Sequence, residues 1–351
     1  MKPAQGPPAQ SPEPSSARGW WAPPPDELSR SFAAGGMPRS LPGFVWTVSA
    51  RSQMWLALLA VAVFALNTAP LELQRRMLNA MVVGGQLELL LGLAVLYALV
   101  VLAEGLVKLT MNVYRGWVGE KAVRTLRLTT SAIVHGRPVS AGRVDVQGVG
   151  ISLLLAEPEP LGAFAGIAVS ELVLQIGILV SVFGYMFYIE PLLAFVSLAV
   201  FSPQLLFVPL MQRAINRRVR ARIAVLREAS VGMLESSARD EERRLRQELR
   251  FAEIFRLNLG IYELKYSMNF LMNLVQNVGK VTILAVGGWY VIEGRTEVGT
   301  VVAFVSGFHN LADPWGDLVH WFQDMTLNDA KYRSFVAAIE TLRDEIPAGR
   351  P

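Results

Sequence analysis

The sequence of 351 residues contains no cysteine and only three histidines. The absence of cysteine excludes disulfides, thiol nucleophiles and thiolate metal sites. His135, His309 and His320 form no H-E-x-x-H pair, and the sequence contains no serine nucleophile elbow. It also lacks the G-x-x-x-x-G-K-[ST] loop, whose backbone amides hold nucleotide phosphates. We therefore expect no covalent catalysis, no metal and no nucleotide cofactor in this chain.

Charged residues are scarce, at 18% of the chain, whereas hydrophobic residues make up 52% and the mean hydropathy is +0.36. These values exceed what the core of a soluble domain needs, and they indicate an integral membrane protein. An apolar helix of about 20 residues crosses hydrocarbon roughly 30 Å thick. The apolar segments predict six such spans, at about 52–71, 87–114, 160–189, 191–212, 266–292 and 298–320.

Basic residues are distributed unevenly between the segments that join these spans. Arg115–Arg143 contains six basic residues and one acid, and Arg213–Arg256 contains 12 arginines and 7 carboxylates. The turns at the opposite ends of the spans carry only Arg75, Arg76 and Arg295. The positive-inside rule then predicts that both termini are cytoplasmic, in the plasma (inner) membrane. This distribution explains the basic composition as membrane topology, so we expect no nucleic-acid partner.

The two ends of the chain differ from the apolar segments. Residues 1–41 are rich in Pro, Ser, Ala and Gly, and they predict a disordered cytoplasmic tail. Leu41–Ser52 mixes apolar residues with Arg51, which favours a short amphipathic helix at the membrane interface. Residues 42–342 then form the membrane domain, and 343–351 form a C-terminal tail.

The second predicted span contains two charged residues, Glu104 and Lys108. Their i,i+4 spacing places them on one helix face, where they can neutralise each other. Charges inside a membrane usually pair. We therefore prefer an internal ion pair to a contact with substrate.

Polar residues form a stripe on each of the last two predicted spans. Steps of three and four place Asn269, Asn273, Gln276, Asn277 and Lys280 on one face of the fifth. The second stripe comprises His309, Asp313, Asp317, His320 and Asp324. Both stripes are candidates for the lining of a substrate cavity, and Asp324 is expected to lie beyond the membrane. Interhelical hydrogen bonding explains the amides equally well. The spacing also permits a metal site at His309, Asp313 and His320, which we rank below a solvated groove.

Several local motifs resemble the type-1 transmembrane domain of ABC exporters, and the resemblance extends from about residue 41 to 342. The motif Val118–Arg127, with the sequence VGEKAVRTLR, is the most specific. The others are Pro70–Gln74 near the outer end of the first span, Gly287–Ile292, Val298–Phe304 and Asp313-Pro314. The resemblance implies an all-α membrane protein of six transmembrane helices with long cytoplasmic extensions and coupling helices.

In that family, the coupling helices press on ATPase domains, and two six-helix halves act together. By resemblance, Val118–Ser131 would contain the first coupling helix and Leu234–Glu248 the second. The second segment departs from the family pattern, because it reads SSARDEERRL at 236–245. Candidate ATPase-docking residues are Arg124, Arg127, Glu235, Arg239, Asp240, Arg243 and Arg244.

These features predict the permease subunit of an ABC-type exporter for an unknown substrate. A separately encoded ATPase would bind ATP and Mg²⁺, and a second copy or a homologous half would complete a dimer in the bilayer. This chain would then be at most the membrane part of an ATP-hydrolysing transporter. The alternative is a secondary transporter on the same scaffold, driven by the proton gradient.

Overall fold

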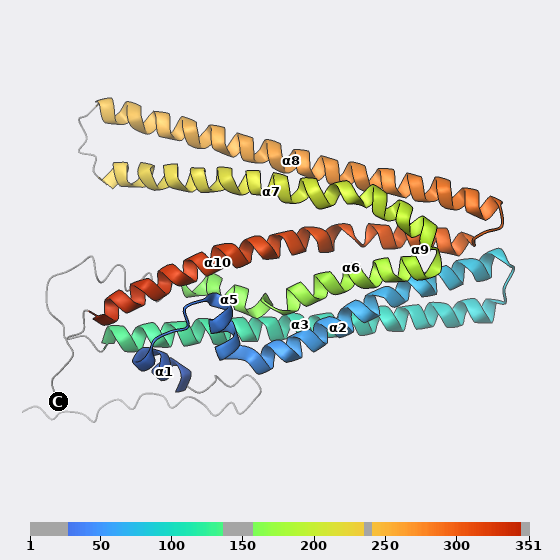
Figure 1. Ribbon diagram of the computed structural model, residues 1–351, viewed down its shortest axis with the longest axis horizontal. Helices are drawn as coiled ribbons and strands as arrows, with labels where there is room; N and C mark the ends of the chain where they lie inside the picture. The colour runs from blue at the N-terminus through green and yellow to red at the C-terminus, as the bar shows by residue number, and fades with distance from the viewer. Residues whose placement is uncertain (1–26, 136–156, 235–240, 345–351) are drawn as a thin grey trace, which may run out of the picture.

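The computed structural model describes residues 27–135, 157–234 and 241–344, and every regular element in these ranges is an α-helix (Figure 1). The all-α prediction is therefore confirmed. The helices are α1 (Glu27–Gly35), α2 (Leu41–Val82), α3 (Leu87–His135), α5 (Pro158–Ile167), α6 (Ser170–Ile189), α7 (Pro191–Leu234), α8 (Glu241–Ile292), α9 (Val298–His309) and α10 (Ala312–Asp344).

Helix α2 begins with a short helical segment where the sequence predicts an interfacial helix. The side chain of Ser40 accepts a hydrogen bond from the Gly43 amide and caps the helix, as serine commonly does. At Ser49 the backbone leaves helical geometry, with φ −143° and ψ 22°, before the first span starts. The kink separates Leu41–Val48 from the spanning part of α2. The first of these segments can therefore lie along the interface.

The long helices continue well beyond the hydrocarbon thickness. Helix α3 has 49 residues and α8 has 52, which at about 1.5 Å per residue is more than twice roughly 30 Å. Val118–Ser131 is the interior of α3, so the prediction of a separate coupling helix there is wrong. Residues 241–248 are likewise the first turns of α8, and 235–240 lie outside the described residues.

Two predicted spans are each built from two helices. The third consists of α5 and α6, which meet at Ala168 and Val169, and the sixth consists of α9 and α10, which are separated by Asn310 and Leu311. By length and composition, five helical segments among the described residues can cross a membrane. Helix α9 has only 12 residues, so the sixth predicted span includes the break and the start of α10.

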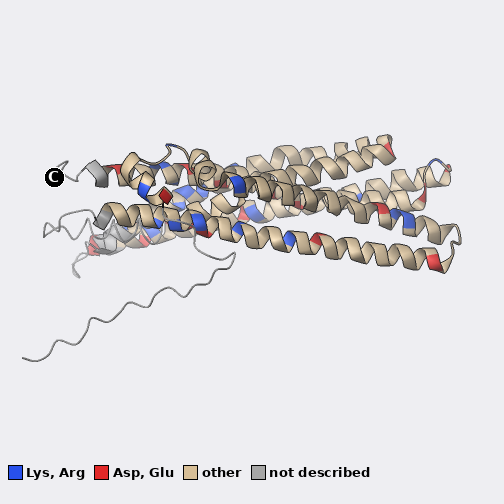
Figure 2. Ribbon diagram, turned by 90° about the horizontal axis from the view of Figure 1, so that it is seen from below, with Lys and Arg blue, Asp and Glu red and all other residues tan. Residues whose placement is uncertain are grey.

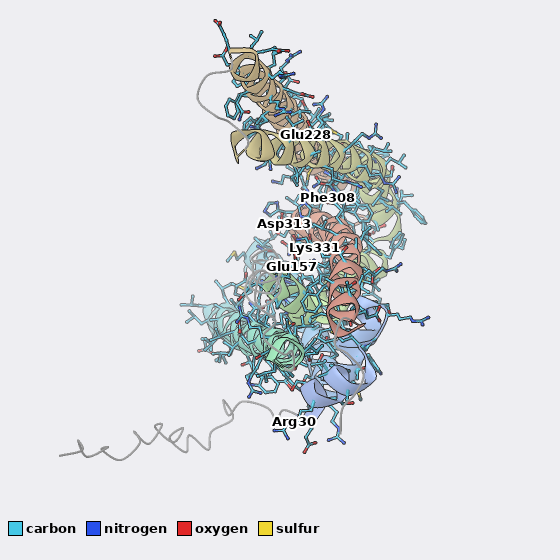
Figure 3. All side chains as sticks on the ribbon, turned by 90° about the vertical axis from the view of Figure 1, so that its left-hand side faces the viewer. Arg30, Glu157, Glu228, Phe308, Asp313 and Lys331 are labelled. Carbon is cyan, nitrogen blue, oxygen red and sulfur yellow. The ribbon has the colours of Figure 1, made fainter. Side chains whose placement is uncertain are left out.

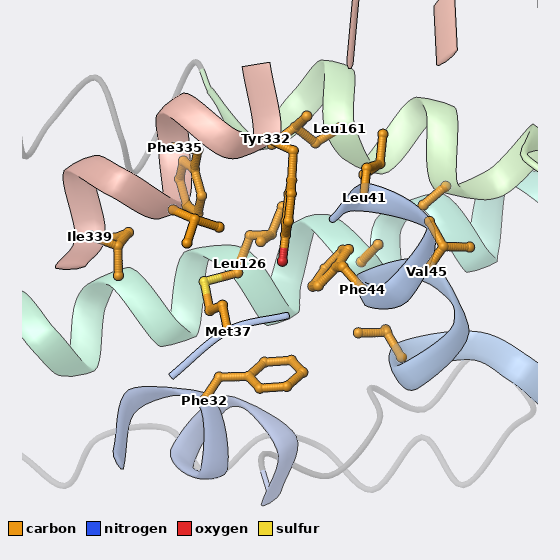
Figure 4. Close-up of a cluster of buried hydrophobic side chains, with 14 of the residues drawn as sticks. Phe32, Met37, Leu41, Phe44, Val45, Leu126, Leu161, Tyr332, Phe335 and Ile339 are labelled. Carbon is orange, nitrogen blue, oxygen red and sulfur yellow. The ribbon is translucent and has the colours of Figure 1, made fainter. Parts of the chain in front are cut away.

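The predicted tail is wrong over residues 27–41, because these residues include α1 and pack onto the helical bundle. Phe32 and Met37 are buried in an apolar cluster with Phe44 of α2 and Tyr332 of α10 (Figure 4). The Tyr332 hydroxyl donates a hydrogen bond to the Pro38 carbonyl at 2.8 Å. Composition alone does not reveal this docking, because it depends on a few apolar side chains meeting distant helices.

Helices α7 and α8 pack along each other as a hairpin, and at the α1 end of the molecule this hairpin stands apart from the other helices (Figures 1 and 3). At the opposite end lie the α2–α3 turn at Gly84 and the α8–α9 turn at Gly294, and there the helices converge. Most charged residues lie towards the α1 end (Figure 2). We call the two ends the α1 end and the Gly84 end.

Candidate functional site

The polar stripe of the sixth predicted span is exposed along its whole length. His309 closes α9, Asp313 lies in the first turn of α10, and Asp317, His320 and Asp324 follow on the same helix. All five side chains are exposed. In the view along the helices, Asp313 and the neighbouring Phe308 lie on α10 and α9 between the α7–α8 hairpin and the remaining helices (Figure 3). The other described helices therefore leave this stripe uncovered.

The stripe on α8 divides into exposed and buried members. Asn269, Asn273 and Asn277 are exposed, and Lys280 is half-buried. Gln276 is only 8% exposed, and neither polar atom of its amide has a hydrogen-bond partner among the described residues. The three asparagines thus remain candidates for a cavity lining, whereas Gln276 faces packed protein.

A series of polar contacts joins α3, α6 and α10 near Asp317, close to the end of the sixth predicted span. Arg115 on α3 forms an ion pair with Glu171 on α6 at 2.9 Å. The amide nitrogen of Gln175 donates to Glu171 at 2.6 Å and to Asp317 at 3.2 Å. Asp317 is therefore held by a neighbouring helix, while Asp313, one turn earlier, has no such contact in the described part of the chain.

Sequence reasoning did not assign Arg115, Glu171 or Gln175 to this site. Glu171 interrupts an otherwise apolar segment, and that interruption was the available signal. Which residue it pairs with depends on the packing of α3 against α6, which the spacing along one helix does not reveal.

The predicted ion pair between Glu104 and Lys108 is not formed within 4.0 Å in the described structure. Instead, Glu104 accepts a hydrogen bond from the Asn67 amide of α2 at 3.1 Å. The i,i+4 rule identifies neighbours on one helix, and here a side chain on the adjacent helix takes the contact. Lys108 is exposed on α3.

The candidate docking residues are only partly described. Arg127 forms an ion pair with Glu159 on α5, and Arg124 also has a contact. Arg243 and Arg244 belong to the first turn of α8, while Glu235, Arg239 and Asp240 lie outside the described residues. For the described members, Arg124, Arg127, Arg243 and Arg244, the proposed role depends on the position of their helix ends near the α1 end.

The histidines and carboxylates of the described residues do not gather as a metal site. No group of three or more His, Asp or Glu side chains in the described ranges could hold a metal ion. The combination of His309, Asp313 and His320 therefore has no support from the geometry.

A comparison of the sequence with known families identifies the family of this chain. A family model for the ABC transporter transmembrane region matches residues 54–236, just over half of the chain. The match begins in the first predicted span, includes α3, α5 and α6, and extends through α7. No curated protein matches the chain. The chain is a multi-pass membrane protein that belongs to the ABC transporter transmembrane region family.

Proposed function

We propose that this chain is the permease subunit of an ABC-type exporter and that its substrate moves along the polar faces of α8, α9 and α10. The main support is that His309, Asp313 and Asp317 are exposed within a predicted span. Ionisable groups at membrane depth face the interior of a bundle or a water-filled cavity rather than lipid. An exposed stripe therefore supports a path that a second half would enclose.

A partner half and an ATPase complete the proposed machine. Long apolar stretches remain exposed, including Leu99 and Leu102 on α3 and Phe270 on α8, and lipid or a second half would cover them. The 351 residues contain no phosphate-binding loop, and in this proposal ATP and Mg²⁺ bind to a separately encoded ATPase chain. That chain would dock at the α1 end, which the proposal places on the cytoplasmic side of the inner membrane.

Co-purification in mild detergent tests the ATPase partner. We expect the tagged chain to recover an ATPase that lacks its own membrane domain. The variant R243E/R244E, which reverses two candidate docking charges, should lose most of that ATPase. R213E is the matched control, because it reverses an exposed arginine of α7 outside the proposed docking segments. Recovery of no ATPase, together with transport that persists after ATP depletion, would contradict the proposal.

A proton-driven transporter is the second candidate. It is favoured by the exposure of His309 and Asp313 on either side of the α9–α10 break, since such groups serve as proton relays in membranes. It predicts transport that collapses with a protonophore and does not respond to ATP depletion. Transport that is unchanged in H309Q and D313N would exclude these residues as the relay.

A further inference from the structure

Two glutamine side chains are buried between apolar clusters in the middle of the bundle. Gln204 of α7 is 0% exposed and Gln276 of α8 is 8% exposed. The amide nitrogen of Gln204 donates to the Met272 carbonyl at 3.2 Å. Among the described residues, no hydrogen-bond partner is found for Gln204 Oε1, Gln276 Oε1 or Gln276 Nε2, and each atom has less than 1 Å² exposed. This is an unusual set of unsatisfied groups for the interior of a membrane protein.

Both glutamines lie level with the break between α9 and α10. Phe308 packs on Gly279 and Val301 packs on Gly287, which fixes the antiparallel register of α8 against α9. Continued by one helical turn, that register places Gln276 beside Leu311, inside the break. Gln204 lies at the same level, because its backbone carbonyl accepts a hydrogen bond from the Trp315 indole of α10 at 3.2 Å.

The break includes a backbone oxygen that loses its regular helical donor. In an unbroken helix, the Asn310 carbonyl would accept a hydrogen bond from the residue four positions later. That residue is Pro314, which has no N–H group. Broken helices at membrane depth expose such carbonyls, and in transporters unwound carbonyls coordinate monovalent cations.

Unpaired buried amides destabilise a protein, and lipid offers no water to compensate them. We propose that a small monovalent cation binds at this level, coordinated by the side-chain oxygens of Gln204 and Gln276 and by the Asn310 carbonyl. These ligands are neutral oxygens, and no cluster of three His, Asp or Glu is present among the described residues. A monovalent ion fits this set better than a divalent one, which requires carboxylates. Asp313, in the first turn of α10, supplies a negative charge close to the break.

The cation site goes beyond the proposed function, since it requires neither an ATPase nor a known substrate. Binding can be measured on the full-length chain alone. If the permease assignment failed, the cation measurement would be unaffected, and the reverse is also true.

Thermal unfolding of the purified full-length protein in detergent tests the site, with NaCl compared against N-methyl-D-glucamine chloride at equal ionic strength. A ligand that binds only the folded state raises Tm. We expect Na⁺ to raise Tm by about 1–3 °C, because a chain of 351 residues has a large unfolding entropy and its Tm shifts less than that of a smaller domain. Equilibrium binding of radioactive Na⁺ should show saturation.

The variants Q204M and Q276M remove the unpaired amides while roughly keeping side-chain volume. Q276M should fold at least as stably as the wild type in N-methyl-D-glucamine, because an apolar replacement of an unsatisfied polar group is neutral or stabilising. Q204M also loses the hydrogen bond to the Met272 carbonyl and should fold about as stably as the wild type. Each should lose the Na⁺-dependent shift in Tm and the bound Na⁺. N277L, which removes the exposed amide of the next residue on α8, should keep both.

Three results would overturn the proposal. The first is a wild-type Tm that does not differ between the two salts. The second is a Na⁺ shift that survives in the Q204M/Q276M double variant. The third is a glutamine variant whose Tm differs from that of the wild type by the same amount in both salts. That result would indicate an internal water in place of a cation.

Discussion

Tyr332 shows how one side chain can join distant parts of this molecule. Its ring is fully buried against Phe44, with ring centroids 5.3 Å apart, and its hydroxyl reaches Pro38. One turn earlier on α10, Asp329 accepts a hydrogen bond from the Leu41 amide at 3.1 Å. A carboxylate at this position also stabilises the N-terminal end of α2. The two residues hold the start of the interfacial helix against α10.

Replacement of Tyr332 by phenylalanine should lower the free energy of unfolding by about 0.5–1.5 kcal/mol at neutral pH, the usual effect of one lost hydrogen bond. Burial raises the pKa of the Tyr332 phenol above its ordinary value of 10.0. The unfolded chain therefore ionises first as pH rises. The advantage of the wild type over Y332F is complete below about pH 10 and shrinks above it. Chemical unfolding at pH 8 and pH 10.5 measures the difference in unfolding free energy between the wild type and Y332F. This difference should be smaller at pH 10.5 than at pH 8.

Glu72 organises the Gly84 end. Its carboxylate accepts hydrogen bonds from Arg75 at 2.8 and 2.9 Å, from Arg76 at 2.6 Å and from the Tyr185 hydroxyl at 2.8 Å. Because bonds to charged groups are the stronger ones, E72Q should lower the unfolding free energy by about 1.5–3 kcal/mol. E88Q, at an exposed carboxylate on α3, is the control. Equal unfolding curves for the two variants in detergent would contradict this role.

At the scale of elements, glycines allow α3 and α5 to approach closely. A Cβ at Gly166 would collide with the backbone carbonyl of Arg115, and one at Gly162 would collide with Val123 and the Gly119 carbonyl. The two α5 glycines are four residues apart, a spacing that favours close helix packing in membranes. The contact positions Arg115 beside α6, where it pairs with Glu171.

Gly166→Ala should therefore separate α3 from α5 and destabilise the protein by about 1–3 kcal/mol, as overpacking typically does. Gly116→Ala is the matched control, because nothing lies within 4 Å of a Cβ at that position. It should be neutral or stabilise α3 by about 0.5–1 kcal/mol. Thermal unfolding in detergent compares the two, and a Gly166→Ala variant as stable as the control would contradict the close approach.

The sequence predicts an element well when the length of an apolar segment and the residues next to it determine where the element begins and ends. The short helix predicted before the first span follows this rule, and the structure contains a helical segment there, ahead of the kink at Ser49. It is less informative where partners come from distant segments. Glu104 pairs with Asn67 instead of Lys108, and Phe32 is buried by residues of α2 and α10 that are distant in sequence. The break at Asn310 depends on Pro314, whose effect a hydropathy pattern does not separate from a continuous span.

At the scale of the whole molecule, contacts between α2, α6 and α9 tie the Gly84 end together, while the α7–α8 hairpin stands apart at the α1 end (Figure 1). Asn79 of α2 accepts a hydrogen bond from the Gly299 amide at 2.8 Å and donates one to Glu297 at the start of α9. This asymmetry leaves the polar faces of α8 and α10 exposed. The central claim of a water-accessible path depends on those faces.

Single-cysteine labelling tests this claim most directly, because the chain contains no cysteine that would react in the background. Cysteine would be placed at Asn273, His309 or Asp313 on the polar faces, and at Leu274 or Val278, which are both 46% exposed and lie one turn apart on the apolar face of α8. Each variant in sealed membrane vesicles would be treated with a charged, membrane-impermeant thiol reagent. We expect rapid labelling at the three polar positions and little at the two apolar ones. Equal labelling of both sets, or no labelling at the polar positions, would contradict a solvated path along α8 and α10.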